Sequence, residues 1–294
     1  MIGELGGLGA AAAWAIVSTV MRSLSNRINP VMVNALNSSF ASLTIAISLV
    51  LLGHTGMLLA TPARSVVLIV ASGMIGQGVG NACFVTSMKM IGASRAMPIS
   101  SLQPLITTFL AAAVLGERVT WLQVTGTMLV LAAVYLLAFP YGPLGQIRHL
   151  LDSADRRGLL LAIVTAACWA SSTVILKEGL AGVDLLSANF LRMAVAASML
   201  LSFQTFTSGR GALRGITRRA LATLALTGIL GTFSSLGYLT AVSYAGAAKA
   251  SVLTSTSPLL GLPLSIFVLH ERVNRRIAAG SLLCIFGICL VLLG

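Results

Sequence analysis

The histidines, cysteines and acidic residues are the side chains that could carry catalysis or hold a metal ion. The chain has 294 residues, with three histidines, four cysteines and only seven acidic residues. His54, His149 and His270 lack a spacing typical of metal ligands, and no apolar run contains the pair of carboxyl groups that general acid and base catalysis needs. Cys284 and Cys289 do not form a C-x-x-C motif. We therefore predict that the protein is not an enzyme and uses no metal or other cofactor.

Polar side chains recur at helical spacing within long apolar runs. Trp14 and Ser18 lie one helical turn apart, and the amides of Gln77 and Asn81 have the same spacing. Polar groups find no partner in lipid, so a stripe of them should face the protein interior or a watery cavity. For any single serine, threonine or glycine, helix packing is the alternative. The residues predicted to line a substrate cavity are Trp14, Gln77, Asn81, Ser100, Gln103, Trp169, Arg192, Ser235, Tyr238, Thr254 and Ser257.

Arg192 stands out because it lies well inside the apolar run 184–206. A guanidinium group at that depth needs a carboxylate, backbone carbonyl groups, a water-filled cavity or a route by which the side chain reaches the membrane surface. No acidic residue lies in the interior of an apolar run to pair with it. Two interpretations stay open: the side chain extends to the nearer surface, or it offers positive charge to an anionic substrate.

The overall composition indicates the environment of these polar residues. Hydrophobic residues make up 57% of the chain, charged residues only 9%, and the mean hydropathy is +0.96. A soluble domain carries about 25% charged residues, so a chain this apolar is a membrane protein. Barrel strands alternate apolar and polar residues, whereas this sequence stays apolar for about twenty residues at a time, the length of a membrane-crossing helix.

Ten such runs are bounded by charged residues, Pro, Gly or Asn. We predict an all-α integral membrane protein with ten transmembrane helices at 5–25, 31–53, 65–90, 94–115, 120–139, 157–179, 184–206, 218–244, 248–269 and 275–293. The longest connection, 140–156, is interpreted as a linker between two domains, 1–139 and 157–294. Pro104 and Pro258 lie within the fourth and ninth runs, where each should free a carbonyl group and kink its helix.

The basic residues lie almost entirely in the gaps between the apolar runs. The chain carries 19 Lys and Arg residues against seven acidic residues, a formal net charge of +12. They form no basic stripe with interleaved aromatic residues, so we expect no nucleic-acid partner. Fourteen of them follow odd-numbered runs and four follow even-numbered runs, which by the positive-inside rule places both termini outside the cytoplasm.

The sequence contains an internal duplication. Residues 92–126 align without a gap on residues 246–280, with thirteen identities in 35 positions. A shift of 155 residues extends the match upstream and places Asn37 opposite Arg192, so the buried charge belongs to one copy only. Because each copy has five helices, an odd number, the second copy enters the membrane from the opposite face. Inverted repeats of this kind are typical of transporters with a site near the membrane midplane.

Each copy opens with an apolar helix that carries one tryptophan, Trp14 or Trp169, and closes with a hairpin that reads LGERV or LHERV around Glu117 and Glu271. We interpret each glutamate as a local cap that pairs with the arginine after it. Over essentially the whole chain, these features resemble the drug/metabolite transporter superfamily, specifically its EamA-type members. The resemblance implies a ten-helix exporter or facilitator of small metabolites, amino acids or drugs, with a central cavity. It also implies termini in the cytoplasm, opposite to the charge count.

We predict a secondary transporter or exporter of small metabolites, such as amino acids or other zwitterionic, anionic or neutral solutes, that works by alternating access of the two repeats. The lack of carboxyl groups inside the apolar runs disfavours proton exchange through a buried glutamate. The alternative is a non-transporting membrane scaffold or assembly subunit, whose polar stripes only pack helices. We expect a multi-pass protein of the plasma membrane, monomeric, with lipid and a small-molecule substrate as its partners.

Overall fold

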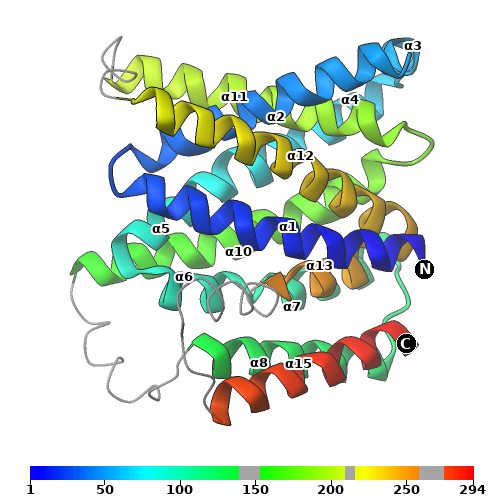
Figure 1. Ribbon diagram of the computed structural model, residues 1–294. Helices are drawn as coiled ribbons and strands as arrows, with labels where there is room; N and C mark the ends of the chain where they lie inside the picture. Colours follow the sequence, from blue (N-terminus) through cyan, green and yellow to red (C-terminus); the bar gives the residue numbers. More distant parts are fainter. Residues whose placement is uncertain (139–152, 209–215, 258–274) are drawn as a thin grey trace.

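The computed structural model describes residues 1–138, 153–208, 216–257 and 275–294, which contain helices and no strand (Figure 1). The helices before the first gap are α1 (Ile2–Ser25), α2 (Pro30–Leu51), α3 (Thr55–Leu59), α4 (Ala63–Ser72), the π-helix η1 (Gly73–Gly80), α5 (Asn81–Ile91), α6 (Ala93–Ser100), α7 (Gln103–Leu115) and α8 (Trp121–Ala138). Those after it are α10 (Ser153–Gly179), α11 (Leu185–Ser208), α12 (Arg218–Ala245), α13 (Ala247–Thr254) and α15 (Arg275–Leu293).

The lengths and surfaces of these helices suit a membrane. Six helical stretches of the described chain are long and apolar enough to cross one, and shorter apolar helices accompany them. Large apolar side chains face outward, among them Phe109, Phe206 and Phe233, which are 73%, 90% and 66% exposed. Surface of this kind is stable in lipid but not in water. The predicted fold class, an all-α membrane protein of two inverted five-helix repeats, is confirmed.

The third crossing consists of α4, η1 and α5 end to end, where the sequence predicts one continuous helix at 65–90. Its π-helical turn is rich in glycine and packs closely against the second repeat. A Cβ atom at Gly73 would lie 2.8 Å from Cα of Arg192, and one at Gly80 would lie 2.9 Å from Cδ1 of Trp169. Small residues therefore let the backbone of η1 approach α10 and α11.

The fourth crossing is broken rather than kinked at its proline. α6 ends at Ser100 and α7 begins at Gln103, so Pro104 lies in the first turn of α7, where its missing N–H costs nothing. The prediction of a mid-helix kink at Pro104 is therefore wrong in position. In the second repeat α13 ends at Thr254, which corresponds to the end of α6. Pro258 lies outside the described residues.

The helices pair in the pattern that an inverted duplication requires. α1 packs along α12, and α10 packs in the same way along α4, η1 and α5. α2 and α11, which correspond to each other, pack together, and so do α8 and α15. The pair α8–α15 lies at one edge of the molecule, beyond α6, α7 and α13, and the two chain ends lie at the same end of the bundle (Figure 1).

Two buried apolar clusters occupy equivalent places in the two repeats, and we call them the first and second end clusters. The first end cluster comprises Val17, Met21, Val33, Phe84, Val85, Met88, Ile91, Ala96 and Leu224. The second end cluster comprises Ile69, Leu176, Leu180, Ala188, Leu239, Ala241, Val242 and Ala250. The repeat offset relates Met21 to Leu176 and Met88 to Val242. Because the repeats are inverted, the two clusters lie at opposite ends of the bundle.

α2 and α11 run antiparallel and are joined at both ends by polar contacts. At one end Gln204 Nε2 donates to Oδ1 of Asn29, the N-cap residue of α2, over 3.3 Å. At the other end Asp184, which precedes α11, lies 3.1 Å from Nδ1 of His54. The duplication places Asn29 opposite Asp184. These contacts tie the first repeat to the second on either side of the bundle.

Glu117 caps a helix of the other repeat rather than its own hairpin. Its carboxylate accepts hydrogen bonds from the backbone N–H groups of Ala247 and Ala248, over 2.8 and 3.2 Å, at the start of α13. Gly246, at φ +91°, makes the turn that exposes these groups, in a conformation that favours glycine. The local role predicted for Glu117 is thus wrong in its partner, and Glu271 lies outside the described residues.

Candidate functional site

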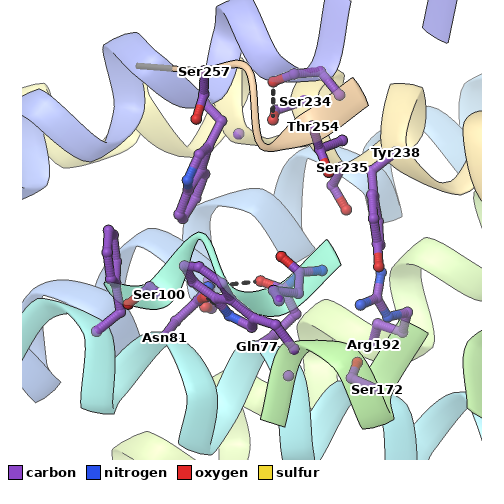
Figure 2. Close-up of a pocket in the computed structure, with 18 of the residues that line it drawn as sticks. Gln77, Asn81, Ser100, Ser172, Arg192, Ser234, Ser235, Tyr238, Thr254 and Ser257 are labelled. Carbon is purple, nitrogen blue, oxygen red and sulfur yellow. Dashed lines mark hydrogen bonds between the residues drawn. The ribbon is translucent and has the colours of Figure 1, made fainter. Parts of the chain in front are cut away.

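A cavity with a volume of about 140 Å³ lies between the two repeats (Figure 2). Its wall is built by α1, α2, η1, α5, α6 and α7 from the first repeat and by α10, α11, α12 and α13 from the second. The volume is roughly ten times the minimum that a single water molecule needs. The cavity is therefore large enough for a small organic molecule, and either repeat alone supplies only part of its wall.

All eleven residues predicted to line a substrate cavity line this one. Figure 2 shows Ser235, Thr254 and Ser257 across the cavity from Gln77, Asn81 and Ser100, and Tyr238 extending toward Arg192. The duplicated polar stripes therefore converge on a single space, although the part that each residue plays in binding stays a prediction.

Other residues also line the cavity that were not predicted from the sequence, including Asn37, Phe84, Ser172 and Ser234. For two of them the duplication held a signal, because Asn37 corresponds to Arg192 and Phe84 corresponds to Tyr238. Ser172 and Ser234 carried no such signal, since a single serine in an apolar helix is ordinarily a packing residue.

Two amides and an indole form a hydrogen-bonded chain along the wall. Trp169 Nε1 donates to Asn81 Oδ1 over 2.9 Å, and Asn81 Nδ2 donates to Gln77 Oε1 over 2.8 Å. The spacing of one turn between Gln77 and Asn81, across the junction of η1 and α5, makes the second bond possible. This chain fixes the orientation of Asn81 and joins the third crossing to α10.

Three aromatic rings form the apolar side of the cavity. The centroid of Phe84 lies 4.9 Å from that of Trp169, and the Trp14 ring lies 6.5 Å from Phe84 and 6.4 Å from Trp169. The pair of tryptophans is T-shaped, with an interplanar angle of 82°. Such edge-to-face packing is favourable between aromatic rings and holds the three side chains as one rigid surface.

Tyr238 connects α12 with α10 and α11 across the cavity. Its hydroxyl group lies 2.5 Å from Oγ1 of Thr173, which also receives a long hydrogen bond of 3.4 Å from Gln103 Nε2. The Tyr238 ring lies beneath the guanidinium group of Arg192, whose Cζ is 5.6 Å from the ring centroid. A cation over a tyrosine ring is attracted by the ring's negative face.

Arg192 is buried in the cavity wall and does not reach the membrane surface. The residue is only 1% exposed, so the interpretation in which its side chain extends to a surface is wrong. Its Nε and Nη1 atoms have no hydrogen-bond partner. Of the six buried side-chain atoms without a partner in the described chain, five belong to Asn34, Asn37, Asn189 and Arg192, at corresponding positions of α2 and α11.

The cavity thus offers three kinds of recognition: a rigid aromatic surface, several hydroxyl and amide groups, and one positive charge. Ser235 Oγ donates to Asn189 Oδ1, and Ser234 Oγ donates to the backbone carbonyl of Ala10 over 2.9 Å, so part of the polar wall is already engaged within the protein. Arg192 and Asn37 retain unused capacity. The arrangement suits reversible binding of a small solute rather than covalent chemistry.

Comparison with known proteins gives a family match over nearly the whole chain. Residues 1–139 and 156–293 match the model of the EamA-like transporter family. A protein of Archaeoglobus fulgidus named "Uncharacterized transporter" is 25% identical over 233 residues, which are 78% of this chain and 77% of that protein. "Uncharacterized transporter YyaM" of Bacillus subtilis is 26% identical over 250 residues, 84% of this chain and 80% of that protein.

A solved structure described as "Crystal structure of protein" is similar to this one over 99% of the present chain and 96% of its own. The TM-score is 0.80 at 18% sequence identity. At that identity the likeness concerns the fold alone.

Proposed function

Because the chain belongs to the EamA-like transporter family, we propose that it is a secondary transporter of small metabolites that works by alternating access of its two repeats. The observation that carries this proposal is the cavity whose wall comes from both repeats. A scaffold whose polar residues only packed helices would need no such space, and the partly unsatisfied polar wall would be a cost without a purpose.

The two end clusters supply a means of alternation. Each is an apolar contact at one end of the bundle, and the duplication makes them equivalent in position although different in sequence. Opening one cluster while the other stays closed would expose the cavity to one side of the membrane at a time. The clusters are built from equivalent helices. A rocking motion in one direction would therefore open the first end cluster, and the same motion in the opposite direction would open the second.

The expected setting of this transporter is the plasma membrane, where it acts as a monomer with lipid and its solute as the only partners. Its basic residues contact anionic lipid headgroups rather than nucleic acid. The apolar helices support the membrane setting in general.

The test is solute flux in vesicles reconstituted with the purified protein. A panel of radiolabelled amino acids, nucleobases, neutral solutes and organic acids should show saturable flux with at least one member, and Gln103→Ala should reduce it because Gln103 lines the cavity. The control is Arg118→Ala, an exposed residue outside the cavity wall, which should leave flux unchanged. If no member of the panel moves faster than in protein-free vesicles, the proposed function is wrong.

A further inference from the structure

The positive charge of Arg192 has no counter-ion among the described side chains. The residue is 1% exposed, and its Nε and Nη1 atoms have no hydrogen-bond partner. Tyr238 offers its ring face to the guanidinium, which compensates for part of the lost hydration but is not an anion. An ionised group kept from water without a counter-ion is strongly destabilising, so this position needs a functional reason.

The acidic residues with described side chains are all engaged elsewhere. Glu4 contacts the chain's N-terminal amino group, Glu178 pairs with Arg64, and Asp184 contacts His54. Glu117 is occupied by the start of α13. Each of these carboxylates lies at a helix end, whereas Arg192 lies within α11. The counter-ion of Arg192 must therefore come from outside this part of the chain.

Among the described residues that line the cavity, Arg192 is the one charged side chain. Because Arg192 is 1% exposed, a bound solute should neutralise that single charge, since excess buried charge of either sign carries a large desolvation penalty. A cation would repel the guanidinium, and the ammonium group of a zwitterion would find no carboxylate. A phosphate monoester carries close to two negative charges at neutral pH, which is one too many. One negative charge fits.

We propose that the solute is a monocarboxylate with an apolar body, and that Arg192 holds its carboxylate group; this inference rests on the proposed transport function. Arginine is well suited to carboxylate recognition because its donors are fixed in one plane. Asn37, the counterpart of Arg192 in the first repeat, also lines the cavity, and its side-chain oxygen lacks a partner.

The aromatic rings of the cavity indicate the chemistry of the rest of the solute. Trp14, Phe84 and Trp169 line the same cavity and form a rigid surface whose indole N–H at Trp169 is already bonded to Asn81. What remains exposed to the cavity from these rings is largely apolar, and it suits an aromatic or branched hydrocarbon group. The solute thus has one anionic end and one apolar end.

The first experiment measures binding by thermal unfolding of the purified full chain at about pH 7.5. The probe is 3-phenylpropanoate, with the neutral 3-phenylpropanamide and the cationic 3-phenylpropylamine as matched compounds at equal ionic strength. A ligand at free concentration L that binds only the folded protein stabilises it by RT ln(1 + L/Kd), so the unfolding temperature keeps rising with the ligand concentration above Kd. We expect a concentration-dependent rise with the carboxylate and no rise with the amide or the amine. Equal shifts with carboxylate and amide would overturn the proposal.

The second experiment assigns the carboxylate to Arg192. Arg192→Gln should weaken the apparent affinity for 3-phenylpropanoate by about tenfold or more, since it removes a charge-assisted contact. Arg192→Lys keeps the charge without the planar donors and should weaken binding less. Arg27→Gln, the same substitution at an exposed arginine, should bind as the parent does.

Stability separates this role from a purely structural one. If Arg192 exists for the ligand, Arg192→Gln should unfold at the same or a higher temperature than the parent in the absence of ligand, because an uncompensated buried charge is gone. A fall in the unfolding temperature together with an unchanged response to the carboxylate would show a structural role. Flux in vesicles distinguishes this inference from the transporter proposal. If the parent moves neutral solutes but no carboxylate, and Arg192→Gln moves the neutral solutes equally well, this inference is wrong while the transporter proposal stands.

Discussion

Buried polar side chains are satisfied in some parts of this molecule and not in others. Asn81 both accepts from Trp169 and donates to Gln77, so its amide is used at both ends. Asn37 and Arg192 keep unused capacity. An unpaired buried polar group costs about 1–3 kcal/mol. Asn37 and Arg192 are the residues with such groups that also line the cavity in the described chain, which is why we propose them for the solute.

For single residues, the sequence predicted many of the polar side chains that line the cavity but not which residues they contact. Burying an amide or a guanidinium group in lipid is unfavourable, so Gln77, Asn81 and Arg192 could be predicted as cavity residues from their types alone. It did not identify their partners, because these come from helices far apart in the sequence, as Trp169 does for Asn81. Arg192 had two possible environments, and only the packing of α11 against η1 distinguishes them.

Asp184 gives a prediction about pH. Burial by itself would raise the pKa of this carboxyl group, but hydrogen bonds from the backbone N–H and hydroxyl groups of Ser187, together with the contact to His54, outweigh burial and lower the pKa below its usual value of 3.8. A carboxyl group with a lowered pKa in the folded state stabilises the protein above the usual pKa. That stabilisation disappears as the pH falls through the lowered value.

Asp184→Asn should therefore lower the free energy of unfolding by about 1 kcal/mol at neutral pH, and the difference from the parent should shrink below about pH 4. Thermal unfolding between about pH 7 and pH 3 measures this. Glu178→Gln is the control, because its pair with Arg64 is exposed and an exposed pair contributes little. A difference between parent and Asp184→Asn that stays constant through the acid range would contradict the assignment.

Helix breaks and caps, rather than continuous helices, shape the elements that surround the cavity. α6 and α7 meet at a break beside the lining residues Ser100 and Gln103, and η1 ends directly before Asn81. A break exposes backbone groups that a continuous helix would use internally, and it changes which side chains point inward. The sequence predicted a kink at Pro104, but the break in the fourth crossing precedes it, between Ser100 and Gln103. Pro104 itself lies in the first turn of α7, where proline is tolerated.

The π-helix η1 could not be predicted from residue types, because the closest neighbours of its glycines belong to the second repeat, more than 80 residues away in the sequence. A Cβ atom at Gly73 would collide with Arg192, and one at Gly80 would collide with Trp169. The glycines therefore indicate that η1 packs closely against another helix, but they do not specify π-helical rather than α-helical hydrogen bonds. Similarly, a glutamate after a helix suggests a local cap, and nothing in the sequence near Glu117 points to α13, which lies about 130 residues away.

The cap at α13 gives a prediction for this element. Glu117→Ala removes a charged acceptor from two backbone N–H groups at a helix start and should lower the free energy of unfolding by about 1–2 kcal/mol. Glu117→Gln, which keeps an acceptor oxygen without the charge, should lose less. Arg118→Ala, at the exposed neighbouring residue, is the control. Chemical denaturation in mild detergent measures all three, and equal stability of Glu117→Ala and the parent would argue against the cap.

For the whole molecule, the duplication in the sequence predicted the architecture most fully. Two copies of five helices, inverted, account for the pairing of α1 with α12 and of α10 with the third crossing. The duplication also relates the two end clusters, although their residues differ, for example Met21 against Leu176. Such differences allow the two ends to have unequal stability, which a symmetric packing of identical residues would not.

If the two end clusters open alternately during transport, a cross-link that keeps the first end cluster closed should reduce flux. In a cysteine-free background, Met88→Cys combined with Leu224→Cys allows a cleavable thiol cross-linker to bridge α5 of the first repeat and α12 of the second within the first end cluster. Bridging should reduce flux by about tenfold or more, because one access route no longer opens, and cleavage of the linker should restore it. Each single-cysteine variant treated with the same reagent is the control. Full flux through the bridged protein would contradict alternating access at this cluster.

α8 and α15 supply none of the described residues that line the cavity, and they meet through Gly126 and Gly287, where a Cβ on Gly287 would lie 2.8 Å from the backbone oxygen of Gly126. Exposed apolar side chains such as Met128 and Leu282 suit contact with lipid, and in lipid one apolar residue is nearly as good there as another. During divergence, these two helices should accumulate changes faster than α1 or α10, with the two glycines as fixed points in otherwise drifting sequence.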